Sequence, residues 1–389
     1  MEWKEVRLES ILALPSRNGL TKPSKIRGKG VKMIGMGELF ANPIIYDIPM
    51  DRVPVTDKEL SNSRIMPGDL LFARQSLTLE GAGKCCYVKE VKEETVFESH
   101  LIRIRIDNTK ADAEFIYYFF NSFIGKCLIQ NLVTQVAAAG IRGSELVKLD
   151  ITIPKEVEDQ RRIASILSSL DRKIELNNKI NADLEEMAQA IFKNWFVDFE
   201  PFKDGEFVDS ELGMIPKGWK VGCLGDIAEI TSGKRPPKKS KDKTKDLSIP
   251  LIGASDIMGF TSDVLCERPI LVIGRVGTHG VVQRFQEKCW PSDNTLVIES
   301  SYYNYVYQLL KGIDYSAINR GSTQPLITQT DVKNTDVIIA PENVLKEYES
   351  ITSTLFSKHR ANIKESTHLS LLRDTLLPRL MSGEIEVPE

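Results

Sequence analysis

Several features that define common classes of protein are missing from this sequence of 389 residues. No apolar run reaches the roughly 18 residues that cross a bilayer, and the N-terminus MEWKEVRLES has neither the basic start nor the apolar core of a signal peptide. The six cysteines form no CxxC pair, so neither a zinc site nor a disulfide framework is indicated. We therefore expect a cytoplasmic protein without a membrane partner or a metal site.

Motifs of catalysis are also scarce. The sequence Gly81-Ala82-Gly83-Lys84 resembles the end of a P-loop, but Thr78 stands where that loop needs its first glycine and Cys85 where Ser or Thr would hold magnesium. It is more typical of a turn. No GxGxxG follows a predicted strand, so no dinucleotide fingerprint is present. We expect neither a catalytic residue nor a bound cofactor in this chain.

A hydrophobic content of 42 % indicates a globular protein, and the length suggests two or three domains. The net charge of −3 conceals two basic stretches, residues 16–32 and 232–245. Their candidate DNA contacts are Arg17, Lys22, Lys25, Arg27, Lys234, Arg235 and Lys238. Such stretches are either solvated lysine-rich loops or phosphate contacts, and their recurrence early in each half of the chain favours phosphate.

The most regular stretch is residues 156–196, where apolar positions alternate at steps of four and three. This spacing predicts a coiled-coil helix about 60 Å long, which needs a partner helix. A shift of 185 positions lays it on the C-terminal region, so the partner is an internal repeat. The predicted seam, which would also contact partner subunits, contains Leu170, Ile174, Asn177, Leu184, Ile191, Leu355, Asn362, Leu369 and Leu376. The paired asparagines would fix the register.

The repeat extends to the segments before the helices. Short strand-like runs at 69–74 and 270–275 each end at an arginine, and each half closes with an aromatic helical segment, at 115–129 or 302–310. A polar loop and a last strand then lead to a proline that opens the long helix. Each half thus consists of a mostly β module followed by a long helix.

Polar side chains gather on two loops of each module. Arginine can bond guanine through two hydrogen bonds, Gln or Asn can bond adenine, and glycine lets the backbone approach a phosphate. Each arginine could instead be a surface residue or part of a structural ion pair. The candidate contacts are Arg74, Gln75, Ser76, Lys84, Gln135, Arg142, Arg275, Thr278, His279, Asn319, Arg320, Ser322 and Gln324.

Several segments resemble a known family. Residues 159–167, 170–177 and 184–196 resemble the central conserved region of specificity (S) subunits of type I restriction-modification systems. Pro216-Lys217-Gly218-Trp219 and Gly321-Ser322-Thr323-Gln324 look like that family's second recognition domain, and residues 376–385 resemble its distal conserved region. The first module departs from the pattern, because it has residues 139–144 in place of the Gly-Ser-x-Gln loop.

The resemblance implies an α+β fold in which two mostly β target recognition domains are joined by a long antiparallel two-helix coiled coil with pseudo-two-fold symmetry. Its implied partners are double-stranded DNA, methyltransferase (M) subunits docked on the helices, and restriction/translocase (R) subunits. S-adenosylmethionine, ATP and magnesium would bind those subunits. The expected domains are 1–154 (first recognition domain), 155–198 (central helix), 199–218 (linker), 219–341 (second recognition domain) and 342–389 (distal helix and tail).

Two other interpretations remain open. A coiled-coil adaptor would use its two modules to bind something other than DNA, although the duplicated basic loops count against it. A metal-dependent nuclease could use Asp69, Glu90 and Lys92, but the second half has no equivalent set.

Overall fold

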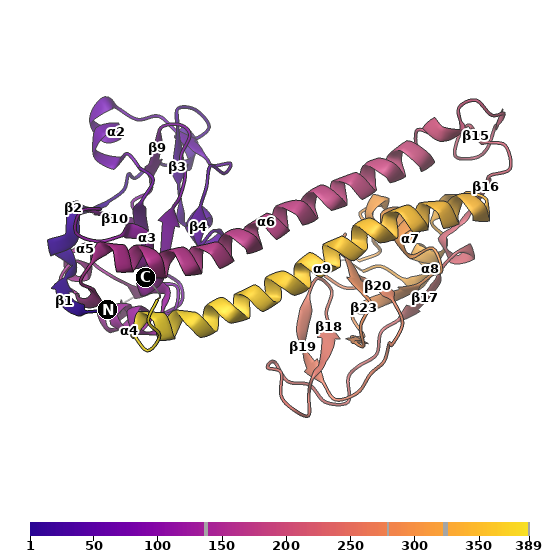
Figure 1. Cartoon of the computed structure of the whole chain (residues 1–389). Coiled ribbons are helices and arrows are strands. Elements are labelled where there is room, and N and C mark those ends of the chain that lie inside the picture. Colours follow the sequence, from indigo (N-terminus) through magenta and orange to yellow (C-terminus); the bar gives the residue numbers. More distant parts are fainter. Residues whose placement is uncertain (136–138, 278–279, 322–325, 388–389) are drawn as a thin grey trace. The chain divides into compact units, whose positions relative to one another are not determined.

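The computed structural model describes residues 1–135, 139–277, 280–321 and 326–387, which form two compact units (Figure 1). Unit 1 comprises Met1–Leu176 and Glu365–Glu389, and unit 2 comprises Asn177–Lys364. Of the helices in these residues, none is both long and apolar enough to pass through a membrane.

Unit 1 begins with strand β1 and ends with the last part of helix α9. Its strands are β1 (Trp3–Arg7), β2 (Leu12–Asn18), β3 (Val31–Ile34), β4 (Ile44–Ile45), β5 (Arg52–Val53), β6 (Asp69–Ala73), β7 (Gln75–Ser76), β8 (Cys85–Val88), β9 (Thr95–Phe97), β10 (Leu101–Ile106), β11 (Thr134–Gln135), β12 (Ala139–Gly140) and β13 (Asp150–Pro154). Its shorter helices are η1 (Leu8–Ile11), η2 (Ser24–Ile26), α1 (Met36–Ala41), α2 (Asp57–Ser63), α3 (Ala113–Asn121), α4 (Phe123–Leu132) and α5 (Gly143–Leu146).

The central sheet of unit 1 has the order β2-β10-β6-β8-β4. All five residues of β6 are buried, because both faces of this strand are covered. On one face, Leu70 and Phe72 pack against α3 and the start of a long helix, and on the other, Leu71 and Ala73 pack with residues near the second sheet, β5-β3-β9. The first and last strands of the module, β1 and β13, pair antiparallel.

Unit 2 repeats this plan. Its strands are β14 (Phe207–Val208), β15 (Ile215–Pro216), β16 (Lys220–Cys223), β17 (Glu229–Ser232), β18 (Ile249–Ile252), β19 (Ile257–Thr261), β20 (Ile270–Gly274), β21 (Val282–Phe285), β22 (Trp290–Pro291), β23 (Thr295–Glu299) and β24 (Asp336–Ile339). Its shorter helices are η3 (Glu200–Phe202), η4 (Leu224–Asp226), α7 (Tyr303–Gly312) and α8 (Gln329–Lys333).

Three sheets of unit 1 have counterparts in unit 2, apart from the edge strand β4. The order β17-β23-β20-β21 repeats β2-β10-β6-β8, the order β19-β18-β22 repeats β5-β3-β9, and β16 pairs with β24 as β1 pairs with β13. As in β6, all five residues of β20 are buried. The internal repeat predicted from the sequence is therefore present in the fold.

The two long helices are α6 (Val157–Phe196) and α9 (Glu342–Met381), each of 40 residues. Their bounds differ by the 185 positions of the sequence repeat. Within unit 1 they run antiparallel, because Asp171 pairs with Arg373 (Oδ1 to Nη1, 2.6 Å) and Lys173 with Glu365 (3.1 Å). Tyr118 of α3 donates to the second oxygen of Asp171 at 2.7 Å and thereby ties the module to the helices.

Within unit 2 the helices contact each other through buried asparagines. Asn362 donates through Nδ2 to Oδ1 of Asn181 at 2.9 Å, and Asn177 donates to the backbone oxygen of Asn362 at 3.4 Å. All three side chains are buried. The remaining residues of the predicted seam are half-buried in their own units: Leu170, Ile174, Leu184, Ile191, Leu355, Leu369 and Leu376.

Two segments differ from the simplest interpretation of the sequence. The aromatic segment at 115–129 lies in two helices, because Ser122 caps α4 by accepting the Gly125 amide and a side chain at Gly125 would collide with the Phe119 carbonyl. The segment 199–218, interpreted as a linker, contains η3 and the paired strands β14 and β15. Trp219 follows it and is buried against Phe196, Phe199 and Phe202.

The asparagine contact makes a stability prediction. Asn362→Ala removes the donor to the buried Asn181 carbonyl, so we expect the free energy of unfolding to fall by about 1–3 kcal/mol. The double variant Asn181→Leu, Asn362→Leu removes both polar partners and should regain most of that loss. Urea denaturation followed by helical circular dichroism would measure both. The exposed Asn178→Ala is the control, and a loss in N362A no larger than in this control would contradict the prediction.

Candidate nucleic-acid interface

In unit 1 the two loops predicted to contact DNA lie side by side. Arg74 follows β6; its amide donates to the His100 carbonyl at 2.8 Å, and its carbonyl accepts the Ile141 amide at 2.9 Å. Strand β12 pairs with both β7, formed by Gln75 and Ser76, and β11. Main-chain hydrogen bonds therefore bring together segments that are more than 60 residues apart in the sequence.

Unit 2 builds the same junction after β20. The Arg275 amide donates to the Asn294 carbonyl at 2.9 Å, the Arg275 carbonyl accepts the Ile327 amide at 3.0 Å, and Val276 forms a bridge with Leu326. Gly277 adopts a φ of 84°, a left-handed conformation that favours glycine. The two arginines thus occupy equivalent places, each at the end of a fully buried strand.

The loop side chains of unit 1 surround an open cavity of about 410 Å³. Gln75 and Ser76 line it together with His100, and the Gln75 Oε1 lies 2.9 Å from the His100 Nδ1. Leu77, also in its wall, is fully exposed. Arg74 is half-buried and Arg142 exposed. Hydrogen-bonding groups and an exposed apolar side chain therefore share one surface.

Two further predicted DNA contacts of unit 1 are Lys84 and Gln135. Gly81–Lys84 is a turn, as the sequence suggested, and the Lys84 ammonium donates to the Phe40 carbonyl at 2.8 Å and lies over the Phe40 ring. Phe40 lines the same cavity, so Lys84 is anchored at its edge. Gln135 belongs to β11, and its side chain lies outside the described atoms.

In unit 2 the side chains of the second loop bind the loop itself. The Asn319 Oδ1 accepts the amides of Gly321 (3.0 Å) and Leu326 (2.9 Å) and so closes the loop. Arg320 donates through Nε to Asp331 at 2.9 Å. Arg275 is half-buried and makes no ion pair with any described residue. Thr278, His279, Ser322 and Gln324 lie outside the described residues.

Asp331 is the anchor of that loop. It is the third residue of α8, where it accepts the Thr328 amide and hydroxyl while the Thr328 hydroxyl accepts the Asp331 amide. Burial raises the pKa of Asp331, but the hydrogen bonds from Thr328 and Arg320 outweigh it and leave the pKa below its ordinary value. Arg320 is therefore both a loop tether and an exposed charge.

The two basic stretches have different environments. In the first, Lys22 pairs with Glu59 at 2.9 Å and Arg27 with Asp51 at 3.0 Å, whereas Lys25 is exposed and Arg17 donates only to the Asn62 carbonyl. In the second, Lys234, Arg235 and Lys238 are exposed and form no ion pair with the described residues. The second stretch therefore leaves more positive charge available to an anionic partner.

The residues of the nuclease alternative do not form a metal site. Asp69 is fully buried, and Arg105 binds both of its oxygens, at 2.6 and 2.7 Å. Glu90 and Lys92 are exposed and pair with each other at 4.0 Å. A search of the described residues finds no group of three or more His, Cys, Asp or Glu side chains placed to hold a metal ion.

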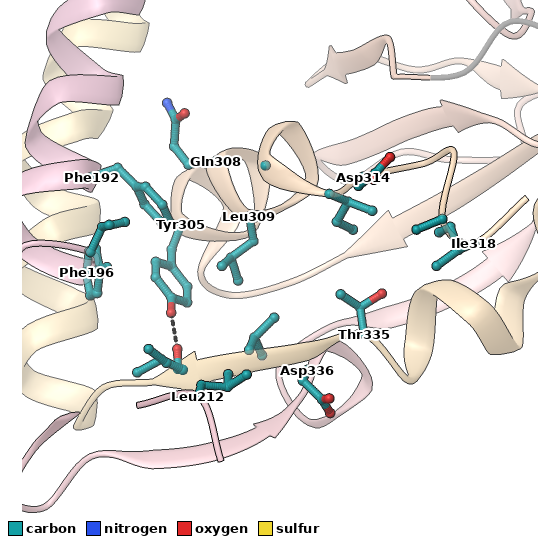
Figure 2. A pocket seen from close by; sticks show the side chains of 16 residues that line it. Phe192, Phe196, Leu212, Tyr305, Gln308, Leu309, Asp314, Ile318, Thr335 and Asp336 are labelled. Atoms are coloured by element: carbon teal, nitrogen blue, oxygen red, sulfur yellow. Dashed lines mark hydrogen bonds between the residues drawn. The ribbon is translucent and has the colours of Figure 1, made fainter. Parts of the chain in front are cut away.

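Unit 2 also contains a largely apolar groove of about 470 Å³. Figure 2 shows Phe192 and Phe196 of α6 beside Tyr305 of α7, whose hydroxyl donates to the Ile338 carbonyl. Leu212 also lines the groove. No basic side chain is among the described residues of its wall, so this groove lacks the chemistry that attracts nucleic acid.

Sequence reasoning missed one charged feature. Arg103 and Arg105 alternate with isoleucines in β10, which suggested only a two-faced strand. The structure places both beside Arg17 and Arg64 in a single cleft. Two arginines at alternate positions of an otherwise apolar strand were the available signal.

Known proteins share this architecture. The family model described as "Type I restriction modification DNA specificity domain" matches residues 1–186 and 216–365. The chain is 32 % identical over 305 residues to the type I restriction enzyme MjaIX specificity subunit of Methanocaldococcus jannaschii, covering 71 % of this chain and 70 % of that protein. It is 24 % identical to the HindI specificity subunit of Haemophilus influenzae, covering 99 % and 100 %.

A solved structure agrees in fold. The crystal structure of the type I restriction-modification S subunit from M. genitalium has a TM-score of 0.62 and 15 % identity, over 98 % of this chain and 96 % of that one. The duplicated module with its long helices is thus the fold of a specificity subunit. The chain belongs to the type I restriction-modification specificity family, which confirms the resemblance found in the sequence.

The Asp331 network makes a pH-dependent prediction. Asp331→Ala removes the partner of Thr328 and Arg320, and we expect a loss of about 1 kcal/mol near pH 7. Because the folded-state pKa is lowered, the stabilisation is present above the unfolded pKa of about 4 and is lost as the pH falls through the folded value. Thermal melts from pH 7 to pH 3 should show the two curves converging. The exposed Asp336→Ala is the control, and a gap that stays constant with pH would refute this role.

Proposed function

We propose that this chain is the DNA-recognition subunit of a type I restriction-modification complex and that each unit reads one half of a bipartite target. The observation that carries the proposal is the duplicated junction at Arg74 and Arg275, in a chain of the specificity family. Two equivalent sites on two equivalent modules suit a target with two separated half-sites.

The loop chemistry supports base recognition. The guanidinium groups of Arg74 and Arg275 form no ion pair with the described residues, so each can donate two hydrogen bonds to a guanine. Gln75 and His100 offer further donors and acceptors, and the exposed Leu77 can contact a thymine methyl group. The basic stretch with Lys234, Arg235 and Lys238 would bind phosphates and position the duplex.

We infer that α6 and α9 form one antiparallel coiled coil with pseudo-two-fold symmetry, which sets the gap between the half-sites. The antiparallel contacts in unit 1, the contacts Asn181–Asn362 and Trp195–Tyr348 in unit 2, and the equal lengths of the helices support this arrangement. Helices of 40 residues are about 60 Å long, which exceeds one turn of B-DNA at about 34–36 Å. The rod is thus long enough to separate two major-groove sites.

Methyltransferase subunits would dock on the helices. Several large apolar side chains of α6 and α9 are exposed, a pattern that favours protein contacts. They are Leu176, Met187, Ile351, Ile363, Leu371 and Leu372. In this proposal the chain neither cuts nor methylates DNA. The methyltransferase carries S-adenosylmethionine, and restriction/translocase subunits use ATP and magnesium.

Single-loop variants test the assignment of one unit to each half-site. We expect Arg275→Ala to relax only the second half of the target and Arg74→Ala only the first, each losing about 1–3 kcal/mol of discrimination. Co-expression with the neighbouring methyltransferase gene, followed by sequencing with modified bases identified, gives the motif directly. Arg268→Ala, an exposed arginine just before β20, is the control. Equal weakening of both halves would assign these arginines to phosphate or structural contacts.

Charged seam variants test the spacing. Leu184→Asp combined with Leu369→Asp should separate the helices, because each places an unpaired charge at a half-buried apolar position. The methylated motif should then lose its constant gap or disappear. The exposed pair Asp183→Asn and His368→Gln provides the control. An unchanged gap in the double Asp variant, with the protein still folded, would exclude the rod as the spacer.

A further inference from the structure

An arginine-rich cleft of about 460 Å³ lies in unit 1, and Arg74 is not among the residues that line it. Its walls come from β2, from the end of α2 with the segment that follows it, and from β10. Arg17, Arg64, Arg103 and Arg105 all line it. Four guanidinium groups around one cavity form a concentrated positive field, which requires either internal carboxylates or an external anion.

Internal carboxylates neutralise only one of these charges. Arg105 is paired with Asp69 through two hydrogen bonds. Arg17, Arg64 and Arg103 form no salt bridge within the described parts of the chain. Arg17 and Arg103 donate instead to backbone carbonyls, of Asn62 at 3.2 Å and of Arg64 at 3.1 Å. The cleft therefore retains three uncompensated positive charges.

Arg103 is held in this cleft at a cost. Its side chain is 5 % exposed and packs over the Phe97 ring, and its Nε is buried without a hydrogen-bond partner. Burial lowers the pKa of Arg103; the charge of Asp69 raises it, and those of Arg105 and Arg17 lower it further. Nη1 donates to the Arg64 carbonyl, while Nε and Nη2 donate to no described residue.

The fold itself does not require this arginine. In the pairing of β10 with β6, Arg103 lies opposite Leu71. Leu71 is the third residue before Arg74. In the equivalent pairing of β23 with β20, Val297 lies opposite Val272, which is the third residue before Arg275. Both valines are buried in an apolar cluster. The same strand position thus packs well with an aliphatic side chain. A costly buried charge at a place where the repeat uses valine indicates a function in unit 1 alone.

We propose that the cleft binds phosphate groups of the DNA backbone beside the half-site that unit 1 reads. This inference rests on the proposed DNA-recognition function. Guanidinium groups match the geometry of phosphate oxygens, and the exposed heads of Arg17 and Arg64 flank the fixed, buried guanidinium of Arg103. Asn62 and Arg64 orient two of these arginines through their carbonyls. Contacts of this type add affinity without reading bases.

The test uses the full chain co-purified with its methyltransferase subunits and three variants. Arg103→Met keeps the aliphatic stem against Phe97, and it leaves the Arg64 carbonyl satisfied by Arg105. Arg103→Lys keeps the charge. Arg268→Met removes one exposed arginine from unit 2 and controls for net charge. Binding to a duplex containing the methylated motif and to an unrelated duplex is measured across a potassium chloride series, with the melting temperature of each protein.

Loss of one phosphate contact reduces the magnitude of the negative slope of log K against log salt by about 0.9, which corresponds to a weakening of roughly 5-fold near 0.15 M salt. We expect Arg103→Met to show this change in salt dependence and affinity on both duplexes, and the change should be larger than that in the Arg268→Met control. The methylated motif should not change, the melting temperature should not fall, and Arg103→Lys should retain most of the affinity. A slope equal to that of the control would overturn the proposal, as would a lower melting temperature in both Arg103 variants, which would make Arg103 structural.

Three further outcomes distinguish failure of the proposed function, failure of the cleft assignment and binding of a different anion. If the wild-type complex binds no DNA, the proposed function fails and this inference fails with it. If the wild type binds and methylates but Arg103→Met matches the control, only the cleft assignment fails. Inorganic phosphate at fixed ionic strength could also raise the melting temperature of the wild type but not of Arg103→Met. If Arg103→Met at the same time left the salt dependence of DNA binding unchanged, the cleft would be assigned to a free phosphorylated molecule instead.

Discussion

The direct connection between a closing strand and a long helix constrains both units. Strand β13 ends at Pro154 and α6 begins at Val157, while β24 ends at Ile339 and α9 begins at Glu342. The first turns of each helix are part of a module core, through Ile163 and Leu167 in unit 1 and through Leu345 and Tyr348 in unit 2. A module therefore cannot rotate about the helix that leaves it without opening its own core.

The second constraint acts at the end of each central strand. Because β6 and β20 are buried on both faces, nothing in them can meet a ligand until the strand stops. Each stops at an arginine whose amide and carbonyl are both bonded to other segments. The side chain of each arginine can thus leave the core while its backbone is held by two hydrogen bonds. Such a position suits ligand recognition, because a rigid backbone positions a side chain that can itself move.

Features that depend on local periodicity could be predicted from the sequence. The heptad spacing and the 185-residue shift anticipated two helices of equal length, and the apolar runs at 69–74 and 270–275 anticipated β6 and β20. Pairing between distant short segments could not be predicted, since two-residue strands such as β7 and β12 have no pattern of their own. Ion pairs such as Lys22 with Glu59 could not be predicted either, because their partners are distant in the sequence and follow no local pattern. The alternation of β10 concealed that Arg103 is buried beside Phe97.

The use of main-chain atoms at the two loop junctions bears on how such a protein can evolve. The bonds that shape each junction join amides and carbonyls of Arg74, Ile141, Arg275 and Ile327, and an amide or carbonyl survives most substitutions of its own residue. Mutations of these junction residues can therefore change which chemical groups are presented while the junction keeps its shape, whereas the loop of unit 2 also depends on the Asn319 side chain. If these junctions read DNA as proposed, a few point mutations could change the sequence preference without refolding the module.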